Sequence, residues 1–591
     1  MIVRQTSEMT GYPSIDKPWL KYYTEDDLKI EVPKCTIYQN IYDNNKGHPD
    51  DIALNYYGNK ISYNTLFSKV EGCARSLRTI GIGKGDCVNL CTSSVPEAVY
   101  VVLACSRIGT IANFINPLFS QEQMIDRIND TGAEWIIILD ALFELIEPAL
   151  QNTCVKRGVI IPATNSISFP VSRILFFNSD ARKILKRRNR GNQEFFSWDE
   201  FIVWGQNYDG SIDIGYEKDT SAVMVYSSGS TGASKGILLT NDGINAFITA
   251  YKTTGYSDMA NGRGLIFLQM IPIWFSTGVV YSILMPLSQG FTVILEPKFS
   301  KESFAKDLKK YKPQMTLAAT SLWLYVANSD LPIDLSNMKY PVSGGEKILP
   351  REEKRVNDYL QKNGCKKRFY KGYGMCELGS EVSGTTDVDN YHDKRGGVGY
   401  PMLNVSVAAF NIDTDEELKY GECGEIKVCS PARMKGYYKN PKATDEFFKT
   451  DNEGKVWGCT GDIGYVDEDG ELFVLGRSTD CYKRENGETV YLFYIEEEIF
   501  KEASVNQCKV VDIHDRGQTC LVAHIVFDEG TSETDQKIKS IHNHLTEKLP
   551  EYMLPGFYKV RTSMPVHSNG KRDVETLRSD KSGLIEIKKS E

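Results

Sequence analysis

One stretch decides how this chain is organised: Val223-Met-Val-Tyr-Ser-Ser-Gly-Ser-Thr-Gly-Ala-Ser-Lys-Gly236. It begins as an apolar strand and runs directly into residues that are mostly Gly, Ser and Thr. Small residues let a backbone approach a ligand closely and adopt positive φ. Ile237-Leu238-Leu239 resumes the apolar pattern, so the sequence predicts a fixed, ligand-facing loop here and disfavours a flexible linker.

The chemistry of this loop suits an anion, because successive backbone N–H groups can donate to phosphate oxygens. The hydroxyls that can join them belong to Ser227, Ser228, Ser230 and Thr231. Lys235 adds a positive point charge. A Walker A loop is the rival interpretation, but it needs Gly before the lysine and Ser or Thr after it, where this chain has Ser234 and Gly236. A P-loop NTPase is therefore disfavoured.

On either side of the loop, apolar runs typical of strands alternate with helical patterns through most of the large N-terminal part. The predicted strands include Asp86–Thr92, Trp135–Leu139 and Thr292–Leu295, and the predicted helices include Pro96–Ile108 and Ser300–Tyr311. This alternation predicts an α/β fold with substantial parallel sheet. The run from Ala98 to Leu118 is the most apolar, but Arg107, Asn113 and Asn116 interrupt it, which favours a buried helix and strand over a membrane span.

The chain is too long for one hydrophobic core, so two or more domains are expected in its 591 residues. Leu403–Phe410 and Glu425–Ser430 predict a small β-rich subdomain at the end of a large domain, residues 1–477. After Gly476 the pattern changes to short strands, Cys508–Asp512 and Cys520–Phe527, beside a charged helix at Ser532–Lys548. Residues 478–591 are predicted to form a small α+β domain.

Composition excludes several classes of protein. The net charge of −9 argues against a nucleic-acid partner, because such domains are usually strongly basic. The fourteen cysteines are scattered, without C-x-x-C, and neither Cys87/Cys91 nor Cys423/Cys429 has the further ligands of a zinc site. The N-terminus lacks the apolar core of a signal peptide, so a cytoplasmic location is expected.

A basic segment, Ile174–Arg190, has two interpretations. Its apolar residues share one helical face and Lys and Arg occupy the rest, a pattern typical of a helix that lies on an anionic membrane surface. The alternative is a solvated helix packed on the body of the protein. Peripheral membrane contact is thus one prediction and body packing is the other.

The glycine-rich loop resembles the phosphate-binding signature of the adenylate-forming superfamily, which comprises acyl-CoA synthetases, aryl-CoA ligases, peptide-synthetase adenylation domains and luciferases. Further motifs resemble those of the superfamily and follow in its order: Ser343-Gly-Gly-Glu346, Tyr373-Gly-Met-Cys-Glu377, Thr460-Gly-Asp462, Gly476-Arg477 and Pro565-Val-His-Ser-Asn-Gly-Lys571. Six ordered motifs at suitable spacing make coincidence negligible. The resemblance spans roughly residues 35 to 580.

The resemblance implies a role for each motif. It implies that the tyrosine ring of Tyr373 covers adenine, that Glu377 holds Mg²⁺, and that Asp462 and Arg477 meet the ribose. Lys571 would reach the reacting groups from the small domain, which is expected to rotate at the hinge residue Thr479. The implied catalytic residues are Lys571, Glu377 and Lys235. The implied ATP/AMP-binding residues are Ser227, Ser228, Gly229, Ser230, Thr231, Gly232, Lys235, Gly344, Gly345, Glu346, Tyr373, Gly374, Met375, Cys376, Asp462 and Arg477.

These residue types suit the reaction that the resemblance implies. Attack of a carboxylate on the α-phosphate of ATP builds negative charge on phosphate oxygens, which amides, lysines and Mg²⁺ stabilise. The nucleophile is already ionised, so no histidine base is needed. Cys376 stands where the superfamily usually has Thr, and a thiol is the weaker hydrogen-bond donor. Thr479 replaces the usual Asp or Lys of the hinge.

The acid substrate is predicted from Pro272-Ile-Trp-Phe-Ser-Thr-Gly278, which resembles a superfamily motif with Phe275 at a common histidine position. Trp274, Phe275, Gly278 and Ser343 are the expected acyl-pocket residues. Nothing in the stretch would pair with an amino group, so fatty or aryl acids are favoured over amino acids. Lys17-Pro-Trp-Leu20 and the insertion from about Phe169 to Phe201 resemble long-chain fatty-acid ligases and favour a fatty acid.

The acceptor is expected to be the thiol of coenzyme A, because the sequence after the small domain shows no carrier-protein signature. Gly487-Glu-Thr-Val-Tyr491 resembles the segment that faces the thiol acceptor. The expected function is ATP-dependent, Mg²⁺-dependent formation of an acyl-AMP with release of pyrophosphate, then thioester formation. The alternatives are an aryl-acid ligase, an enzyme that loads a separate carrier protein, and a non-catalytic nucleotide- or lipid-binding homologue.

Overall fold

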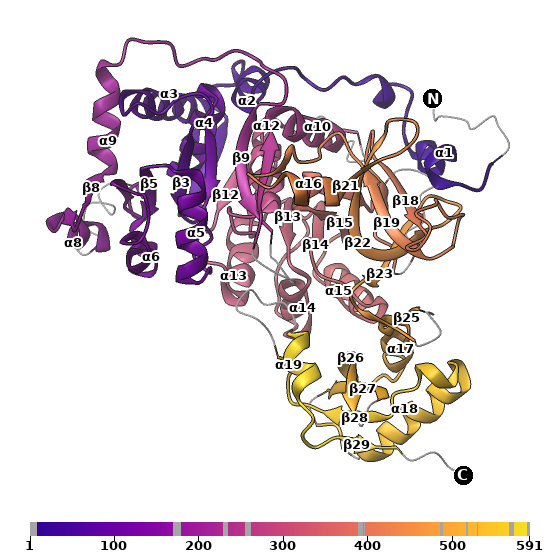
Figure 1. Cartoon of the computed structure of the whole chain (residues 1–591). Coiled ribbons are helices and arrows are strands. Elements are labelled where there is room, and N and C mark those ends of the chain that lie inside the picture. Colours follow the sequence, from indigo (N-terminus) through magenta and orange to yellow (C-terminus); the bar gives the residue numbers. More distant parts are fainter. Residues whose placement is uncertain are drawn as a thin grey trace.

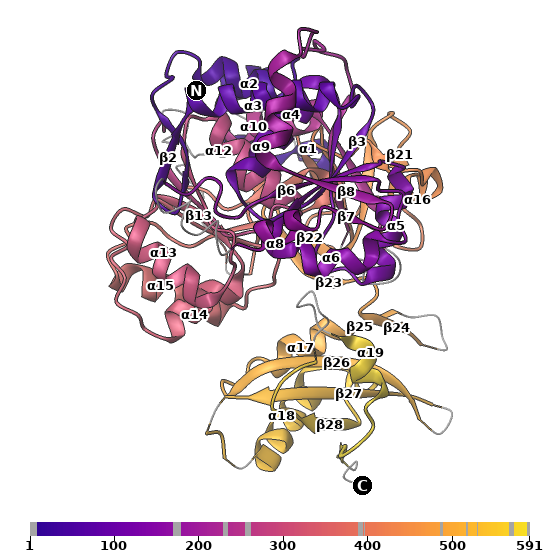
Figure 2. The same ribbon diagram turned by 90° about the vertical axis from the view of Figure 1, so that its left-hand side faces the viewer.

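The computed structural model of the chain describes residues 9–168, 179–227, 234–253, 262–387, 394, 396–484, 489–515, 518–528, 530–532, 534–565 and 573–587. A large body holds most of the chain, and the C-terminal part, in yellow, lies below it in both views (Figures 1 and 2). The strands on either side of the glycine-rich loop belong to the large body, so the candidate site is sought there.

The first large sheet carries the glycine-rich loop at one edge. Its strands run in the order β20 (Gly436–Tyr437), β10 (Gly236–Thr240), β9 (Ser221–Tyr226), β4 (Ile111–Phe114), β3 (Cys87–Cys91), β5 (Trp135–Leu139), β6 (Arg157–Ile161), β8 (Gln193–Ser197) and β7 (Asn189–Arg190). From β9 to β8 the pairs are parallel, and β9–β10 and β10–β20 are antiparallel. The predicted strands near Asp86–Thr92 and at Trp135–Leu139 are confirmed.

The second large sheet carries the Tyr373 motif. Its order is β17 (Tyr400–Pro401), β16 (Ser380–Gly384), β15 (Tyr370–Met375), β14 (Tyr340–Gly344), β13 (Met315–Ala318), β11 (Ile266–Gln269), β12 (Thr292–Leu295), β1 (Ile52–Tyr56) and β2 (Asn59–Ser62). The strands from β15 to β1 are parallel, and β16 returns antiparallel to β15. Parallel strands end at one edge, which gathers the residues that follow them.

Helices that touch one another and strands of both sheets join the two sheets around one apolar core. They are α2 (Ile37–Asn45), α3 (Tyr63–Thr79), α4 (Pro96–Ile108), α10 (Asn241–Tyr251) and α12 (Met285–Ser288), and they run together along the top of Figure 1. α4 is buried along nearly its whole length and β4 follows it, so the predicted buried helix and strand between Ala98 and Leu118 are confirmed. α13 (Lys301–Tyr311) confirms the predicted helix there, with Ser300 as its N-cap.

The β-rich subdomain consists of β18 (Ser406–Phe410), β19 (Gly424–Cys429), β22 (Val456–Val466), β21 (Phe448–Thr450) and β23 (Leu472–Arg477), in orange in Figure 1. The N-terminal helix α1 (Pro13–Asp16) packs on β18. The predicted strands at Leu403–Phe410 and Glu425–Ser430 are confirmed with slightly shorter bounds.

The C-terminal part contains its own sheet. A hairpin of β24 (Cys481–Lys483) and β25 (Thr489–Tyr491) precedes a four-stranded sheet of β26 (Val505–Asp515), β27 (Gln518–Phe527), β28 (Phe557–Val560) and β29 (Ile585–Glu586), with helices α17 (Leu492–Ile499), α18 (Thr534–Lys548) and α19 (Val574–Ser579). The predicted α/β class with a β-rich subdomain and an α+β C-terminal part is confirmed. The domain boundary after residue 477, at the end of β23, stays a prediction.

The basic segment is helical only at α8 (Asp180–Lys186) within the described residues. Ala181 and Ile184 are buried in a core with Phe143 and Phe195, so the described part of the apolar face is covered by the body. Arg188 pairs with Glu200, and Arg190 with Glu147. This arrangement matches the body-packed interpretation; Ile174 and Phe177 lie outside the described residues. Across the described ranges, no helix combines the length and the apolarity needed to span a bilayer.

Candidate active site

The glycine-rich loop joins two paired strands, β9 and β10, and hydrogen bonds connect its first and last described residues. The backbone N–H of Ser227 donates to the carbonyl of Lys235, and the Lys235 N–H donates to Ser227 Oγ, each over 3.0 Å. The predicted residues Ser228, Gly229, Ser230, Thr231 and Gly232 lie outside the described residues. These hydrogen bonds hold the start and end of the loop beside each other at the edge of the first sheet.

Glu377 is held by a tyrosine from a distant part of the chain. Tyr437 on β20 pairs with β10, and its hydroxyl donates to Glu377 Oε1 over 3.0 Å. Lys235 Nζ lies 4.9 Å from the centroid of the same tyrosine ring. Tyr437 therefore links the lysine of the glycine-rich loop to the carboxylate of the Tyr373 motif.

The pKa of Glu377 lies above its ordinary value, although several groups act to lower it. The residue is 8% exposed, and burial raises its pKa. The hydrogen bond from Tyr437 and the positive charges of Arg477 and Lys235 act in the opposite direction and lower the pKa. A nearby cation stabilises the ionised form of a buried carboxylate, so the residue suits a metal ion.

Mg²⁺ commonly binds through one or two carboxylates and the phosphates of a nucleotide. Among the described residues, no group of three or more His, Cys, Asp and Glu could hold a metal ion by itself. One buried carboxylate near the ends of the predicted phosphate-binding loop fits an ion that arrives with its nucleotide. The residues that would hold such an ion are Glu377 and the loop predicted to bind phosphate.

A second cluster joins Tyr373, Asp462 and Arg477. The Tyr373 hydroxyl donates to Asp462 Oδ2 over 2.6 Å, and Arg477 Nε lies 2.9 Å from Asp462 Oδ1. Asp462 on β22 is directly opposite Arg477 on β23, so sheet register brings the two predicted ribose ligands together. Asp462 is buried while Arg477 is exposed, which leaves the guanidinium open to a ligand.

The predicted Ser343–Glu346 loop leaves the end of β14. Ser343 is buried and its hydroxyl bonds to Thr320 Oγ1 over 2.8 Å. Glu346 accepts from the Ser321 N–H over 3.0 Å. Gly345 adopts φ +81°, a conformation open to glycine, and follows Gly344, which pairs with Gly372 of the Tyr373 strand. The loop therefore lies beside Tyr373.

Gly374, Met375 and Cys376 continue the Tyr373 motif. A Cβ on Gly374 would collide with the carbonyl oxygen of Ser380, so glycine is required where β15 and β16 meet. Met375 and Cys376 are half-buried and pack against the main core. The thiol that replaces the usual hydroxyl is thus inside the cluster, one residue from Glu377.

The predicted acid-binding stretch leads into η5 (Thr277–Leu284), a π-helix. Such helices are rare and are often found at functional sites. Trp274 is 8% exposed and packs against Phe275 and Phe299. A Cβ on Gly278 would collide with the carbonyl of Pro272, which explains the glycine.

Thr479, the predicted hinge residue, is exposed between β23 and β24. Next to it, Asp480 accepts a hydrogen bond from Lys509 Nζ over 2.9 Å, which connects the predicted hinge to β26.

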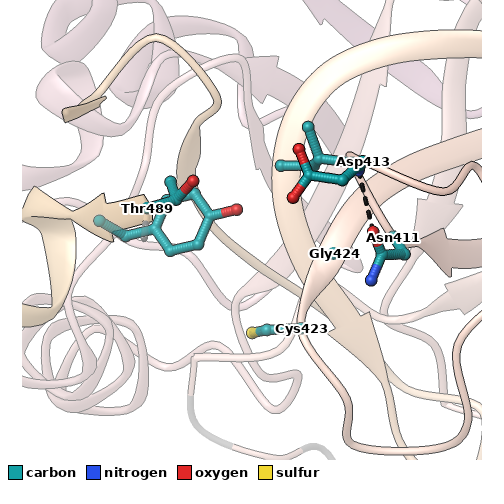
Figure 3. Close-up of a pocket in the computed structure, with 7 residues that line it drawn as sticks. Asn411, Asp413, Cys423, Gly424 and Thr489 are labelled. Atoms are coloured by element: carbon teal, nitrogen blue, oxygen red, sulfur yellow. Dashed lines mark hydrogen bonds between the residues drawn. The ribbon is translucent and has the colours of Figure 1, made fainter. Parts of the chain in front are cut away.

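A cavity of about 210 Å³ lies beyond the predicted hinge. It is lined by Thr489 and Tyr491 of β25 and by Asn411, Asp413 and Cys423 of the β-rich subdomain (Figure 3). In this conformation the segment predicted to meet the thiol acceptor faces the β-rich subdomain. Gly487 and Glu488, and the predicted catalytic Lys571, lie outside the described residues.

Within the described residues, Tyr437 joins Lys235 to Glu377, and Tyr373, Asp462 and Arg477 form a second cluster. The structure adds two residues that the sequence reasoning missed. Tyr437 follows a glycine in Gly436-Tyr437-Tyr438, but only strand pairing shows that it meets Glu377. Glu381, a lone charge in the strand Ser380-Glu-Val-Ser-Gly384, is buried beside the Tyr373 strand. Glu381 belongs to no motif in the sequence, and its burial is visible only in the structure.

Comparison with known proteins identifies the family of the chain. The model of the AMP-binding enzyme family matches residues 41–438, and the model of the AMP-binding enzyme C-terminal domain matches residues 494–571. The chain therefore belongs to the AMP-binding enzyme family, which confirms the predicted membership of the adenylate-forming superfamily.

Relatives match over most of the chain. A long-chain-fatty-acid–CoA ligase of Bacillus subtilis is 26% identical over 568 residues, covering 94% of this chain and 96% of that protein. A probable 4-coumarate–CoA ligase of Dictyostelium discoideum is 25% identical, covering 78% of this chain and 80% of that protein. The crystal structure of ATP-bound MatB from Rhodopseudomonas palustris shares the fold, with a TM-score of 0.72 at 21% identity over 92% of this chain and 98% of that chain. The named relatives are of the enzyme class that the sequence predicted.

Proposed function

We propose that this protein is an AMP-forming acid–CoA ligase that activates a fatty acid as its acyl-AMP and transfers the acyl group to coenzyme A. The observation that carries the proposal is the link from Lys235 through Tyr437 to Glu377, beside the pair of Asp462 and Arg477. This arrangement offers positive charge and a metal-holding carboxylate at one end and ribose-binding groups at the other.

The first half-reaction needs stabilisation of charge on the nucleotide phosphates. In the proposal the loop from Ser227 to Lys235 binds the phosphates and Glu377 holds Mg²⁺. Asp462 accepts hydrogen bonds from the ribose hydroxyls, with Arg477 and Tyr373 on either side of Asp462. The ring of Tyr373 covers the adenine. Lys571 approaches the reacting carboxylate and phosphate from the small domain.

The second half-reaction is proposed to use the same site after the small domain turns about Thr479. The exposed position of Thr479 between β23 and β24 supports this, since a pivot needs few packing contacts. Thr489 and Tyr491 then face the incoming thiol. Coenzyme A is the proposed acceptor, and a separate carrier protein is the alternative.

A fatty acid is the proposed substrate because Trp274 and Phe275 offer an apolar wall and because a relative is named as a fatty-acid ligase. An aryl acid is the second candidate, favoured by the relative named as a coumarate ligase.

We propose that the enzyme is cytoplasmic. Contact with a membrane would have to use residues beyond Ala181 and Ile184, which are buried.

The deciding experiment is ATP–pyrophosphate exchange with purified protein across fatty, aryl and amino acids, followed by thioester formation with coenzyme A or a carrier protein. We expect exchange with fatty acids and acyl-CoA as product. Nucleotide binding without exchange for any acid would replace the proposal with a non-catalytic homologue. Exchange confined to aryl acids would favour the second candidate.

A further inference from the structure

Glu381 on β16 is a buried carboxyl group whose two oxygens have no donor at hydrogen-bonding geometry among the described residues. The residue is 7% exposed. Most buried polar groups in native proteins are paired, and each exception calls for an explanation. A bare buried carboxyl is costly to the fold, so its presence points to a ligand that completes it.

The side chain lies on one defined face of the second sheet. On β15, Lys371 points to the opposite face, where its Nζ lies 3.0 Å from Glu353 Oε2 on α15 (Pro350–Lys362). Gly372 follows, and successive residues of a strand face opposite sides. A Cβ on Gly372 or on Gly384 would collide with Glu381 Oε1, so the carboxyl occupies space left by two glycines.

The same face receives the element that continues the predicted acid-binding stretch. β16 packs against η5, which begins at Thr277, and Tyr281 of η5 is hydrogen-bonded through its hydroxyl to Tyr251 of α10. Burial raises the pKa of Glu381, and a weak hydrogen-bonding interaction with the Tyr251 hydroxyl acts against that rise. Glu381 therefore lies between the predicted acid pocket and the strand that carries Tyr373.

The two segments that meet here contain further buried polar atoms without partners in the described structure. They are Trp274 Nε1 and Ser276 Oγ just before η5, and Ser380 Oγ next to Glu381. Burial raises the pKa of Glu381 to about 8, and no cation opposes that rise. An acyl group made only of methylenes would leave the Glu381 carboxyl unsatisfied, whereas a hydroxyl or amino substituent would supply it with a donor.

We propose that the acid activated by this enzyme carries a hydroxyl or amino group, and that Glu381 receives this donor and selects for it. The inference rests on the proposed ligase function and narrows its substrate from a plain fatty or aryl acid to one that carries a hydrogen-bond donor. It also corrects the expectation drawn from Pro272–Gly278 alone, because the group that recognises the donor comes from a different strand.

The test compares acids of equal chain length that are unsubstituted, hydroxylated or aminated, with the substituent moved along the chain. ATP–pyrophosphate exchange is measured for the unmodified protein, Glu381→Gln and Glu381→Leu, together with the melting temperature of each. Glu97→Gln is the matched control, because Glu97 is also a buried carboxyl but accepts hydrogen bonds from Asn165 and Ser166.

For the unmodified protein we expect kcat/KM for one substituted acid to exceed that of the plain acid by roughly 10-fold or more. Glu381→Leu should lower that preference by about 10- to 100-fold, as loss of a buried hydrogen bond that leaves its partner unsatisfied does, while its melting temperature stays equal or rises. Glu97→Gln should lower the melting temperature and keep the preference. Whether the hydroxylated or the aminated acid responds identifies the donor.

Three outcomes separate the possible failures. Equal or better use of the plain acid, with no change in Glu381→Leu, would overturn the role of Glu381 and leave the ligase function standing. A large fall in the melting temperature of Glu381→Leu with unchanged preference would assign the residue to the fold alone. No exchange with any acid would contradict the ligase function itself.

Discussion

The hydroxyl of Tyr437 donates to Glu377 Oε1 over 3.0 Å, and its ring lies 4.9 Å from the ammonium of Lys235. Tyr437 thus fixes the carboxylate proposed to hold Mg²⁺ and contacts the lysine proposed to bind phosphate. Strand β20, which carries Tyr437, reaches this place by pairing with β10 at the end of the glycine-rich loop. The three residues form one unit although they lie far apart in the sequence.

Replacing Tyr437 by Phe should slow adenylation without unfolding the protein. The ring that contacts Lys235 remains, but Glu377 loses a hydrogen bond, and such a bond to a charged group corresponds to roughly a 10-fold or greater change in rate. We expect pyrophosphate exchange to fall about 10-fold and to need more Mg²⁺ for half-maximal rate. The measurement is exchange across a range of Mg²⁺ concentrations.

Tyr438→Phe is the matched control, because it removes the same atom one residue further on, where the side chain neighbours Cys87. Its exchange rate should stay near that of the unmodified protein. An equal loss in both variants would show that the hydroxyl of Tyr437 has no particular role at Glu377.

Asp462→Asn should weaken nucleotide binding. The change removes the negative charge that pairs with Arg477 Nε and replaces one of the two acceptor oxygens by a donor NH2, so the proposed ribose-binding cluster loses its charge and half of its accepting capacity. We expect KM for ATP to rise roughly 10- to 100-fold, the range for truncating a buried charge-assisted pair. Asp467→Asn, at the other end of the same hairpin and paired with Lys394, is the control. An unchanged KM for ATP in Asp462→Asn would refute the assignment.

Lys571→Ala should abolish acyl-AMP formation and leave the melting temperature unchanged, because one lysine contributes little to stability. The measurement is pyrophosphate exchange, with thioester formation from supplied acyl-AMP assayed separately. Lys581→Ala, whose ammonium donates to the carbonyl of His514, serves as the control. Full exchange by Lys571→Ala would remove this lysine from the proposed mechanism.

Much of the fold follows from local signals. Pro96 at the start and Gly109 in the left-handed conformation at the end set the limits of α4 at the residues that the sequence indicates. The strand at Trp135–Leu139 is an uninterrupted apolar run, as expected where a parallel sheet is covered on both faces.

The site was harder to predict wherever it depends on contacts between distant segments. Motifs indicated Asp462 and Arg477, and the register of β22 with β23 explains why they meet. Tyr437 reaches Glu377 only through the pairing of β20 with β10. Glu381 would be expected on a surface, and it is buried because Gly372 and Gly384 leave room for its carboxyl group. Such spaces belong to the packed structure and have no local pattern in the sequence.

Cys376→Thr should speed adenylation. Cys376 is half-buried next to Glu377, and a hydroxyl donates a hydrogen bond more strongly than a thiol of similar shape. One additional hydrogen bond to a developing phosphate charge corresponds to about 1 kcal/mol or more, so an increase of roughly 5- to 10-fold in the exchange rate is expected. Cys459→Thr, another half-buried thiol, is the control. A slower Cys376→Thr enzyme would mean that the thiol itself is required.

Glu381→Gln should change how stability depends on pH. Burial raises the pKa of Glu381 to about 8 from an ordinary 4.5. Between these values the unfolded chain has lost the proton that the folded protein keeps, so the free energy of unfolding falls as pH rises through this window. The glutamine variant has no such proton, and its stability relative to the unmodified protein should therefore increase from about pH 5 to about pH 8. Melting temperatures measured across that range test this, with the exposed Glu575→Gln as the control. A constant difference would mean that the Glu381 carboxyl ionises normally in the folded protein, and a bare buried carboxyl would then not explain its selectivity.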